Sequence, residues 1–418
     1  MSITLTTVIL FAVFGVLLFL GVPISISIVV SSIVTAMSTL SWDQITFITM
    51  QKMNSGVESF SLLAVPLFIL AGNIMNNGGI AKRLVNFAQL FVGKIPGSMA
   101  QANILGNMLF GALSGSSVAA ASAMGGCISP IEEENGYDPA YSAAANIASA
   151  PTGLLIPPTS AFIVYSTVAG GVSISTLFMA GYIPGIIWAL CCCVVGVLLA
   201  VKLGYKGTPG KFDWKNLGVC TLRALPSLSL IIVVIGGIIG GVFSATEGSA
   251  IAVVYALVLA FCYRSINLKS LWKIIVDSAK MSGMVVFLVG VSNILGWVMA
   301  FLQIPDAVAA ALLSLTSNKY IILLIMNVIL LVSGTFMDVT PAILIFTPLF
   351  LPICQSFGMS TIQFGLILVY NLCIGNITPA CGQRPVCWHQ GGPYLAFQGH
   401  AVHAYVLCCL LYTSDAAD

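Results

Sequence analysis

The chain has 418 residues, of which 59% are hydrophobic and 7% are charged, and its formal net charge is +2 at pH 7. An ordinary soluble domain carries charge on about a quarter of its residues, so this composition excludes one. The near-neutral charge, with no basic patch interleaved with aromatic residues, gives no indication of nucleic-acid binding. The twelve cysteines follow no metal-ligand spacing.

Apolar stretches recur along the whole chain, and most of them, with their flanks, reach the roughly 17–25 residues needed to cross a bilayer. About ten crossings of that length fit into the chain. No Lys or Arg precedes the first stretch and no small-residue cleavage site follows it, so we expect a retained membrane helix rather than a signal peptide. In chain order, the cores of the clearest stretches are Thr7–Leu20 (continuing past Pro23 to Thr39), Leu62–Met75, Ile183–Val201, Leu228–Val242, Ala250–Cys262, Val285–Phe301 and Tyr320–Val332.

Residues that break helices or can coordinate ions occur twice in this apolar sequence, about 220 residues apart. Glycine or proline interruptions at matching places in two halves of a membrane protein indicate a substrate and ion site between the halves. The sequence therefore favours a transporter built from two repeats. The matched positions are Gly21-Val22 with Gly241-Val242, Asn73 with Asn293, Asn107 with Asn327, Ser114-Gly115 with Ser333-Gly334, Gly136 with Gly358, Gly153 with Gly375 and Pro157 with Pro379.

A basic linker at residues 202–223 separates a first repeat, residues 1–201, from a second repeat, residues 224–379. The positive-inside rule places this linker on the cytoplasmic side with two other basic groups, one at residues 82–94 and one at residues 264–280. A single threading satisfies all three groups. It has the N-terminus outside, five crossings per repeat, and a second repeat that is inverted relative to the first.

Each repeat is predicted to contain the same elements in the same order. A pair of spans hinged at Gly21 or Gly241 comes first, and an amphipathic stretch too polar to cross follows it, Trp42–Ser59 or Leu268–Lys280. A span with an asparagine, a short connector and the Ser-Gly segment complete the order.

The Ser-Gly segment of the first repeat contains Ser114, Gly115, Ser116 and Ser117, between two apolar stretches of about 11–14 residues that are too short to cross. This pattern predicts a re-entrant hairpin with these residues at its tip. Backbone carbonyls at such a tip can coordinate Na⁺ where they face protein or a water-filled cavity, and the hydroxyls add neutral oxygen ligands. The alternative is a small-residue face for helix packing; recurrence as Ser333, Gly334 and Thr335 favours a site.

The next element, Tyr141–Ile156, ends at Pro157 and Pro158, which cannot donate backbone hydrogen bonds. Apolar sequence resumes through Ala180, so we predict one broken helix with an unwound middle. Half-helix N-termini suit a carboxylate, whereas C-termini and loose carbonyls suit a cation. The twin in the second repeat is Leu366–Asn376, followed by Ile377, Thr378 and Pro379, with Asn371 opposite Ser149.

Two carboxylates lie in strongly apolar sequence. Intramembrane carboxylates are functional candidates by default, and Asp338, just past the second tip, is the better candidate for a cation site. Glu247 lies near a helix start, where an acidic residue is often structural. We expect the run Glu132-Glu133-Glu134 to be a solvated connector.

These residues resemble the large membrane subunit of the tripartite ATP-independent periplasmic (TRAP) transporters, from about Leu5 to Pro379. Several long motifs in the right order carry the resemblance: Ser114-Gly-Ser-Ser-Val-Ala, Gly136-Tyr-Asp-Pro139, Leu155-Ile-Pro-Pro158, Gly241-Val-Phe-Ser-Ala-Thr-Glu247, Gly334-Thr-Phe-Met-Asp338 and Asn371-Leu-Cys-Ile-Gly-Asn-Ile-Thr-Pro379.

The resemblance implies an all-α, polytopic, elevator-type secondary transporter of the bacterial inner membrane, driven by a Na⁺ gradient, with no cofactor and no enzymatic activity. It also implies a periplasmic binding protein that delivers a carboxylate such as a C4-dicarboxylate or sialic acid, and a small four-helix membrane subunit. Carried over position by position, the ion and substrate site candidates are Ser114, Gly115, Ser116, Ser117, Gly153, Pro157, Pro158, Ser333, Gly334, Thr335, Asp338, Gly375, Asn376, Thr378 and Pro379.

The repeat pattern stops after Pro379, where the family would continue Pro-Pro-Val-Gly and further apolar helix. All three histidines, His389, His400 and His403, lie in the tail at residues 380–418. Codons permitted for this tail, read one base later, can spell the expected motif, so we interpret the tail as a frameshift. A chain with it is expected not to transport, and resequencing the locus would test this.

Three alternative functions are weighed against the TRAP subunit. The first is a self-sufficient Na⁺/dicarboxylate symporter of a related fold, which would need no binding protein. An intramembrane enzyme would need a His pair, an HExxH motif or a catalytic dyad in its spans, and none is visible. A channel is the third, although paired broken helices fit alternating access better.

Overall fold

The computed structural model describes residues 3–205, 207, 214–315 and 318–378, and all the regular structure in these ranges is helical. The first repeat contains α1 (Ile3–Phe19), α2 (Ile24–Ala36), α3 (Trp42–Val57), the 3₁₀ turn η1 (Phe60–Leu63), α4 (Ala64–Asn77), α5 (Ile80–Val92), α6 (Ser98–Ser114), α7 (Ser117–Glu134), α8 (Pro139–Ser149), α9 (Thr152–Leu155), α10 (Ser160–Val168) and α11 (Ile174–Leu203). The second contains α12 (Trp214–Ile239), α13 (Ala245–Cys262), α14 (Leu268–Phe301), α15 (Ile304–Leu315), α16 (Lys319–Phe336), α17 (Val339–Ser356) and α18 (Thr361–Ile377). The predicted all-α membrane fold is therefore confirmed.

Both predicted hinges are tight turns. Gly21 and Gly241 have φ values of +77° and +71°, in the left-handed region that glycine adopts without a Cβ clash. The helix after the second hinge, α13, is capped by Ser244, whose hydroxyl and backbone N–H exchange hydrogen bonds with Glu247 in a capping box. Glu247 thus caps a helix, as its position near a helix start suggested.

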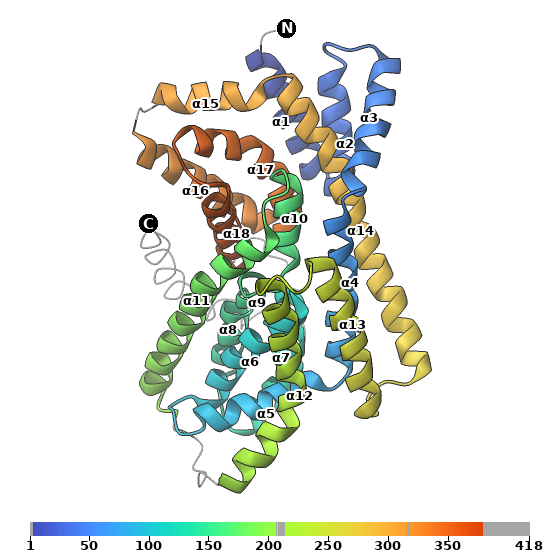
Figure 1. Ribbon diagram of the computed structural model, residues 1–418. Helices are drawn as coiled ribbons and strands as arrows, with labels where there is room; N and C mark the ends of the chain where they lie inside the picture. Colours follow the sequence, from blue (N-terminus) through green and yellow to red (C-terminus); the bar gives the residue numbers. More distant parts are fainter. Residues whose placement is uncertain (1–2, 206, 208–213, 316–317, 379–418) are drawn as a thin grey trace.

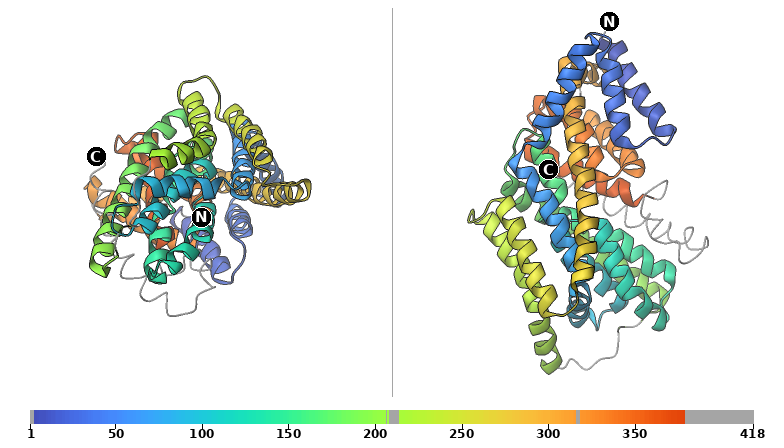
Figure 2. Two further views of the ribbon diagram at one scale, coloured as in Figure 1. Left: turned by 90° about the horizontal axis from the view of Figure 1, so that it is seen from below. Right: turned by 90° about the vertical axis from the view of Figure 1, so that its right-hand side faces the viewer.

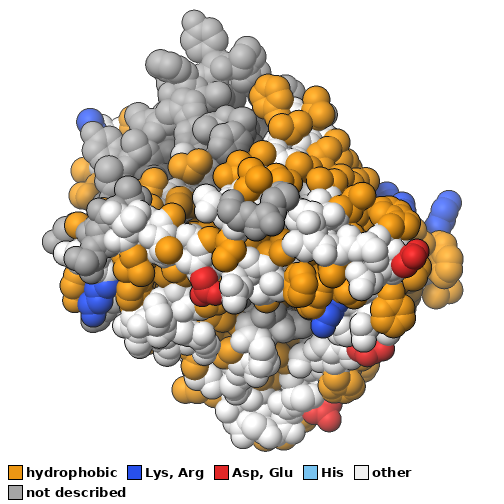
Figure 3. Space-filling model, turned by 90° about the horizontal axis from the view of Figure 1, so that it is seen from above, with side chains coloured by type: hydrophobic (Ala, Val, Ile, Leu, Met, Phe, Trp, Pro, Cys, Tyr) orange, Lys and Arg blue, Asp and Glu red, His pale blue; other side chains and the backbone are white. Residues whose placement is uncertain are grey.

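Fewer helices are long enough to cross a membrane than the roughly ten predicted. In the described part of the chain, five helices are long and apolar enough to cross, or up to seven if each of two bent pairs is one span. Shorter apolar helices, among them α1 and α2, account for much of the difference. On the face seen from above, hydrophobic side chains are widespread and charged side chains are sparse (Figure 3).

The two amphipathic stretches differ in how they join the following span. In the first repeat, α3 ends at Val57, and Pro66 lies in the first turn of α4, where it prevents one continuous helix. The second stretch is part of α14, a single helix of 34 residues that contains no proline. Our expectation that Leu268–Lys280 is a separate element is therefore wrong.

Equivalent segments of the two repeats cross in opposite directions. The Asn73 amide on α4 donates to the Ser278 hydroxyl on α14 over 2.8 Å. Near the other end of the crossing, Gly56 on α3 lies against the side chain of Asn293 on α14, where an added Cβ would lie 2.4 Å from the Asn293 amide nitrogen. Residue numbers therefore rise along one segment as they fall along the other. An inverted repeat requires this antiparallel arrangement.

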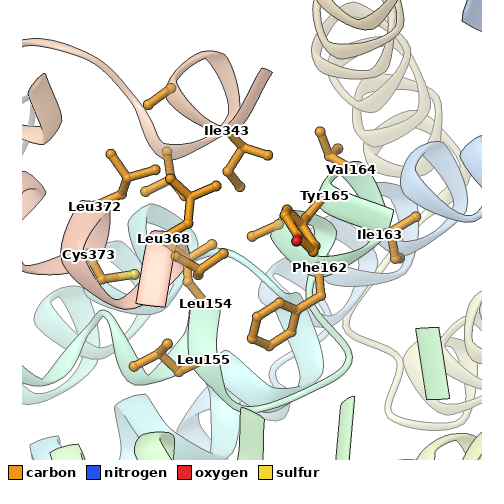
Figure 4. Close-up of a cluster of buried hydrophobic side chains, with 14 of the residues drawn as sticks. Leu154, Leu155, Phe162, Ile163, Val164, Tyr165, Ile343, Leu368, Leu372 and Cys373 are labelled. Carbon is orange, nitrogen blue, oxygen red and sulfur yellow. The ribbon is translucent and has the colours of Figure 1, made fainter. Parts of the chain in front are cut away.

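The helices form two lobes (Figures 1 and 2). The first lobe contains α6–α11 and α16–α18, on the left in Figure 1, and the second contains α1–α4, α13 and α14, on the right. Inside the first lobe, side chains of α9 and α10 such as Leu154 and Tyr165 meet Ile343 of α17 and Leu368 of α18 (Figure 4). Hairpin and broken-helix segments from both repeats therefore share one apolar core.

Candidate functional site

The tip of the first hairpin lies inside the protein. Helix α6 ends at Ser114, Gly115 adopts φ +61°, and Ser116 is extended and caps α7 by accepting a hydrogen bond from the Ala119 N–H. Ser114 and Ser117 are 6% and 3% exposed. The two helices have 17 and 18 residues, longer than predicted, so length alone does not identify a re-entrant hairpin. The buried tip does, because the loop between two spanning helices would lie at the surface.

Glycines let the hairpin approach the broken helix at backbone distance. A Cβ added at Gly111 on α6 would lie 2.3 Å from the Gly153 Cα on α9. A Cβ on Gly115 would lie 2.7 Å from the Pro158 carbonyl oxygen, and the Ser160 hydroxyl lies 3.5 Å from the Gly115 carbonyl oxygen. Tip and helix break are thus in direct contact.

The predicted break at Pro157 and Pro158 is present. Helix α9 ends at Leu155, α10 begins at Ser160, and the two parts of the broken span are bent by 45°. The Pro157–Pro158 peptide bond is cis. The second part ends at Val168 rather than continuing through Ala180, because Gly170 and Gly171 both adopt positive φ before α11 begins.

Two helix C-termini and two helix N-termini therefore converge on this point. Helices α6 and α9 end here, and α7 and α10 begin here, capped by Ser116 through the Ala119 N–H and by Thr159 through the Phe162 N–H. Carbonyl and hydroxyl oxygens suit a monovalent cation, and the helix N-termini suit an anion. No group of three or more His, Cys, Asp or Glu side chains that could hold a metal occurs in the described ranges.

In the second repeat the tip lies later than predicted. Ser333, Gly334 and Thr335 are still helical, and α16 breaks at Met337 and Asp338. The Ser333 and Thr335 hydroxyls donate to carbonyls of their own helix, those of Ile329 and Val332. The prediction that Ser333 and Gly334 form the second hairpin tip is therefore wrong, because the tip lies at Met337 and Asp338. Gly334 instead takes the role of Gly111, since an added Cβ there would lie 3.0 Å from the Gly375 Cα.

The remaining candidates of the second repeat lie at the end of α18. Asn376 is buried, and the Thr378 hydroxyl donates to the Ile374 carbonyl at the helix end. Asp338 begins α17 but makes no capping hydrogen bond, so its half-buried carboxylate beside the second tip is not committed to the helix. Pro379 and the whole tail at residues 380–418 lie outside the described residues.

A buried amide pairing accompanies each site, as the matched positions Asn107 and Asn327 suggest. The Asn107 amide on α6 lies 2.9 Å from both the Asn146 side-chain oxygen and the Ser149 hydroxyl on α8. In the second repeat, the Asn371 amide on α18 donates to the Asn327 side-chain oxygen on α16 over 2.8 Å. Asn371 is the position matched with Ser149, so matched positions are in contact in both repeats, with the donor and acceptor exchanged.

Two features of the structure were not anticipated. Glu132, expected in a solvated connector, is fully buried, whereas Glu133 and Glu134 are exposed. A cavity of about 360 Å³ lies between η1, the α10–α11 connection and the α12–α13 turn. Its lining includes the hydroxyls of Ser61, Ser173 and Ser244 but no residue of either hairpin tip, so it is separate from the candidate ion sites.

Comparison with known proteins places these features in context. The family model for the tripartite ATP-independent periplasmic transporter, DctM component, matches residues 11–384. The uncharacterized protein YgiK of Salmonella typhimurium is 50% identical over 375 residues, 90% of this chain and 86% of YgiK. The isethionate TRAP transporter permease protein DctMQ of Oleidesulfovibrio alaskensis is 37% identical over 90% of this chain, which spans only 59% of that protein. In fold, the chain is similar to the YdaH transporter of Alcanivorax borkumensis, with a TM-score of 0.62 over 90% of this chain and 88% of that one, at 13% identity.

Proposed function

Because the chain belongs to the DctM family of tripartite ATP-independent periplasmic transporters, a family of membrane permeases rather than enzymes, we propose that it imports a small organic acid driven by a Na⁺ gradient. A periplasmic binding protein delivers the acid, and a small four-helix membrane subunit completes the permease in the bacterial inner membrane. The chain itself supplies the path across the bilayer.

The observation that carries the Na⁺ proposal is the buried contact between the first tip and the first helix break. There, the carbonyl groups of Gly115 and Pro158 and the hydroxyl of Ser160 come together in a protein interior. Unwound carbonyls at half-helix ends are the groups that coordinate Na⁺ in secondary transporters. The second site combines the end of α18 with Asp338, whose carboxylate adds a charged ligand.

Alternating access by an elevator movement is supported by the contact between the lobes. At Gly72 on α4, an added Cβ would lie 3.1 Å from the Ser114 backbone at the hairpin tip. Small residues at such a contact let one helix pass close to another without interlocking side chains. The lobe with both hairpins would move, and the lobe with α4 and α14 would stay fixed.

The substrate proposal is an organic acid with a carboxylate, as the family resemblance implies. One relative is named for isethionate, which is a sulfonate rather than a carboxylate. Carboxylate and sulfonate groups both suit the partial positive charge of the α7 and α10 N-termini. A self-sufficient Na⁺/dicarboxylate symporter remains the alternative proposal, and the requirement for a binding protein separates the two.

The test is uptake into proteoliposomes that contain this chain and the small subunit encoded beside it. The chain is compared in two forms, as printed and with residues 380–418 replaced by the translation of the adjacent frame. Candidate acids (a C4-dicarboxylate, sialic acid and isethionate) are offered with and without the neighbouring binding protein. We expect uptake by the frame-restored form only with the binding protein and an inward Na⁺ gradient. Uptake that is equally fast with K⁺ in place of Na⁺ would refute the coupling, and uptake without the binding protein would favour the symporter.

A further inference from the structure

Glu132 is the most deeply buried acidic residue in the described part of the chain, with no exposed surface. It lies in the last turn of α7, immediately before the exposed connector of Glu133 and Glu134. Neither carboxylate oxygen has a hydrogen-bond partner among the described residues. A carboxylate left in this state is costly, because burial without a partner removes its hydration.

Two other buried polar groups beside Glu132 are also without partners. The Asn103 amide nitrogen on α6 and the Ser142 hydroxyl on α8 form no hydrogen bond of normal geometry, although their side chains are 0% and 4% exposed. Both lie close enough to interact with the Glu132 carboxyl. Helices α6, α7 and α8 thus each contribute one buried polar side chain without a hydrogen bond of normal geometry to the same cluster.

The chemistry of this cluster suits a proton. A neutral carboxyl group can accept hydrogen bonds from the Asn103 N–H and the Ser142 O–H, so the cluster contains no buried charge. A metal cation fits less well, because Asn103 directs its amide N–H group, and not its carbonyl oxygen, toward Glu132. The Asn103 side-chain oxygen already accepts from the Asn107 amide over 3.2 Å.

We propose that Glu132, Asn103 and Ser142 form a proton-binding site that holds the inner end of the first hairpin against α8. Protonation keeps α6, α7 and α8 packed, and loss of the proton loosens them by drawing water to the carboxylate. The Asn103–Asn107 contact continues from this site to Asn146 and Ser149. The proton site is thereby connected to the helix that is broken at Pro157.

Among the side chains that the structure describes, no cation lies against the Glu132 carboxyl. Helices α4, α6 and α9, which pack on α7, carry no charged residue, and α8 contributes Tyr141, whose hydroxyl donates to the Gly196 carbonyl. On α5, Arg83 lies over the ring of Tyr263, and Lys82 occupies the first turn. Other ionisable groups described at this end include Tyr137, Tyr205 and Asp138, and the exposed Lys94, Lys202, Glu133 and Glu134.

Burial raises the pKa of the Glu132 carboxyl from its ordinary value of 4.5 to about 7, while Ser142 and Asn103 lower it. The folded protein then binds a proton that the unfolded chain has released at the same pH. Such a group contributes stability that is complete below about pH 4.5 and is lost as the pH rises through about 7.

The experiment measures the apparent melting temperature of the purified full chain in detergent between about pH 5 and pH 8. We expect the melting temperature of the natural protein to fall as the pH rises through about 7. Glu132→Gln, which mimics the neutral carboxyl, should lack this fall. Glu133→Gln is the matched control, since it removes an adjacent exposed carboxylate, and it should keep the fall. A fall that persists in Glu132→Gln overturns the proposal.

A second variant and a spectroscopic readout keep the test decisive if Glu132→Gln does not fold. Infrared difference spectra should contain a carboxylic-acid carbonyl band that titrates near pH 7. Ser142→Ala removes a group that lowers the pKa, so it should move this titration to higher pH. Absence of a titrating band, or an unchanged midpoint in Ser142→Ala, overturns the proposal. So does stabilisation by Na⁺ or K⁺ near pH 8 that disappears in Glu132→Gln, because the ligand would then be a metal cation. None of these measurements requires transport, so they stand apart from the proposed function.

Discussion

Single residues set how closely the hairpin and the broken helix pack. Gly111 and Gly153 meet backbone to backbone, and a side chain at either position has no space. The sequence identifies Gly153, because it has a counterpart at Gly375. It does not identify Gly111, the residue that Gly153 contacts. The contact depends on the angle at which α6 crosses α9, which tertiary packing decides.

Gly111→Ala is therefore expected to destabilise the protein by about 1–3 kcal/mol, the usual cost of overpacking a filled interior. Gly126→Ala on α7 is the matched control, because nothing lies within 4 Å of an added Cβ there. Removal of that glycine should leave stability unchanged or raise it by up to about 1 kcal/mol. The check is thermal melting in detergent, and equal melting temperatures for the two variants would contradict the argument.

Glu132 shows where residue patterns mislead. Three consecutive glutamates next to Asn135 and Gly136 are typical of a solvated turn, and two of the three are exposed as predicted. The helix continues through Glu134, however, so the three side chains point in different directions. One of them must face α6 and α8, and no sequence signal says which.

At the scale of elements, proline and glycine gave the most reliable predictions. The hinges at Gly21 and Gly241 and the break at Pro157 lie where predicted. The second hairpin tip was misplaced, because Gly334 can remain helical and the break is set by Asp338 instead. Repeat matching finds equivalent segments, but an insertion of a few residues within a helix changes which turn becomes the tip.

The helix break predicts the behaviour of a double variant, Pro157→Ala with Pro158→Ala. Two restored N–H groups would allow α9 and α10 to join, which removes the unwound carbonyls from the proposed Na⁺ site. We take the loss of one carbonyl–Na⁺ contact to weaken Na⁺ binding by as much as the loss of a hydrogen bond to a charged group, about 1.5–3 kcal/mol. We therefore expect apparent Na⁺ affinity in uptake assays to fall by about tenfold or more.

The control for this variant is Pro130→Ala, which removes a proline inside α7 away from the break. It should retain Na⁺-dependent uptake. If the double variant keeps the natural Na⁺ affinity while its size-exclusion profile is normal, the break is not part of the ion site.

At the scale of the whole molecule, the all-α membrane fold and the family follow from composition, repeats and motifs. The described part contains five to seven helices that are long and apolar enough to cross, and four shorter apolar helices, of which α1 and α18 have 17 residues, about the lower limit for a crossing. The hydrophobicity of a helix does not show whether it contacts lipid or the interior of the protein, so sequence alone does not fix the number of crossings.

The tail at residues 380–418 gives a prediction for the whole chain. If it results from a frameshift, the printed chain should show no uptake above empty liposomes, while the frame-restored chain transports. Resequencing of the locus is the independent measurement. Uptake by the printed chain, or an intact frame that encodes the printed tail, would contradict the interpretation.

The crossed contacts between α3–α4 and α14 have a consequence for biosynthesis. Asn73 and its hydrogen-bond partner Ser278 are 205 positions apart, so a ribosome needs about 10–40 s to synthesise the residues between them. If the first repeat inserts as it is synthesised, the Asn73 amide is in the membrane without its Ser278 partner during that interval. We expect the nascent chain to depend in this period on an insertase or chaperone that shields polar groups in the bilayer, until the second repeat arrives and completes the scaffold.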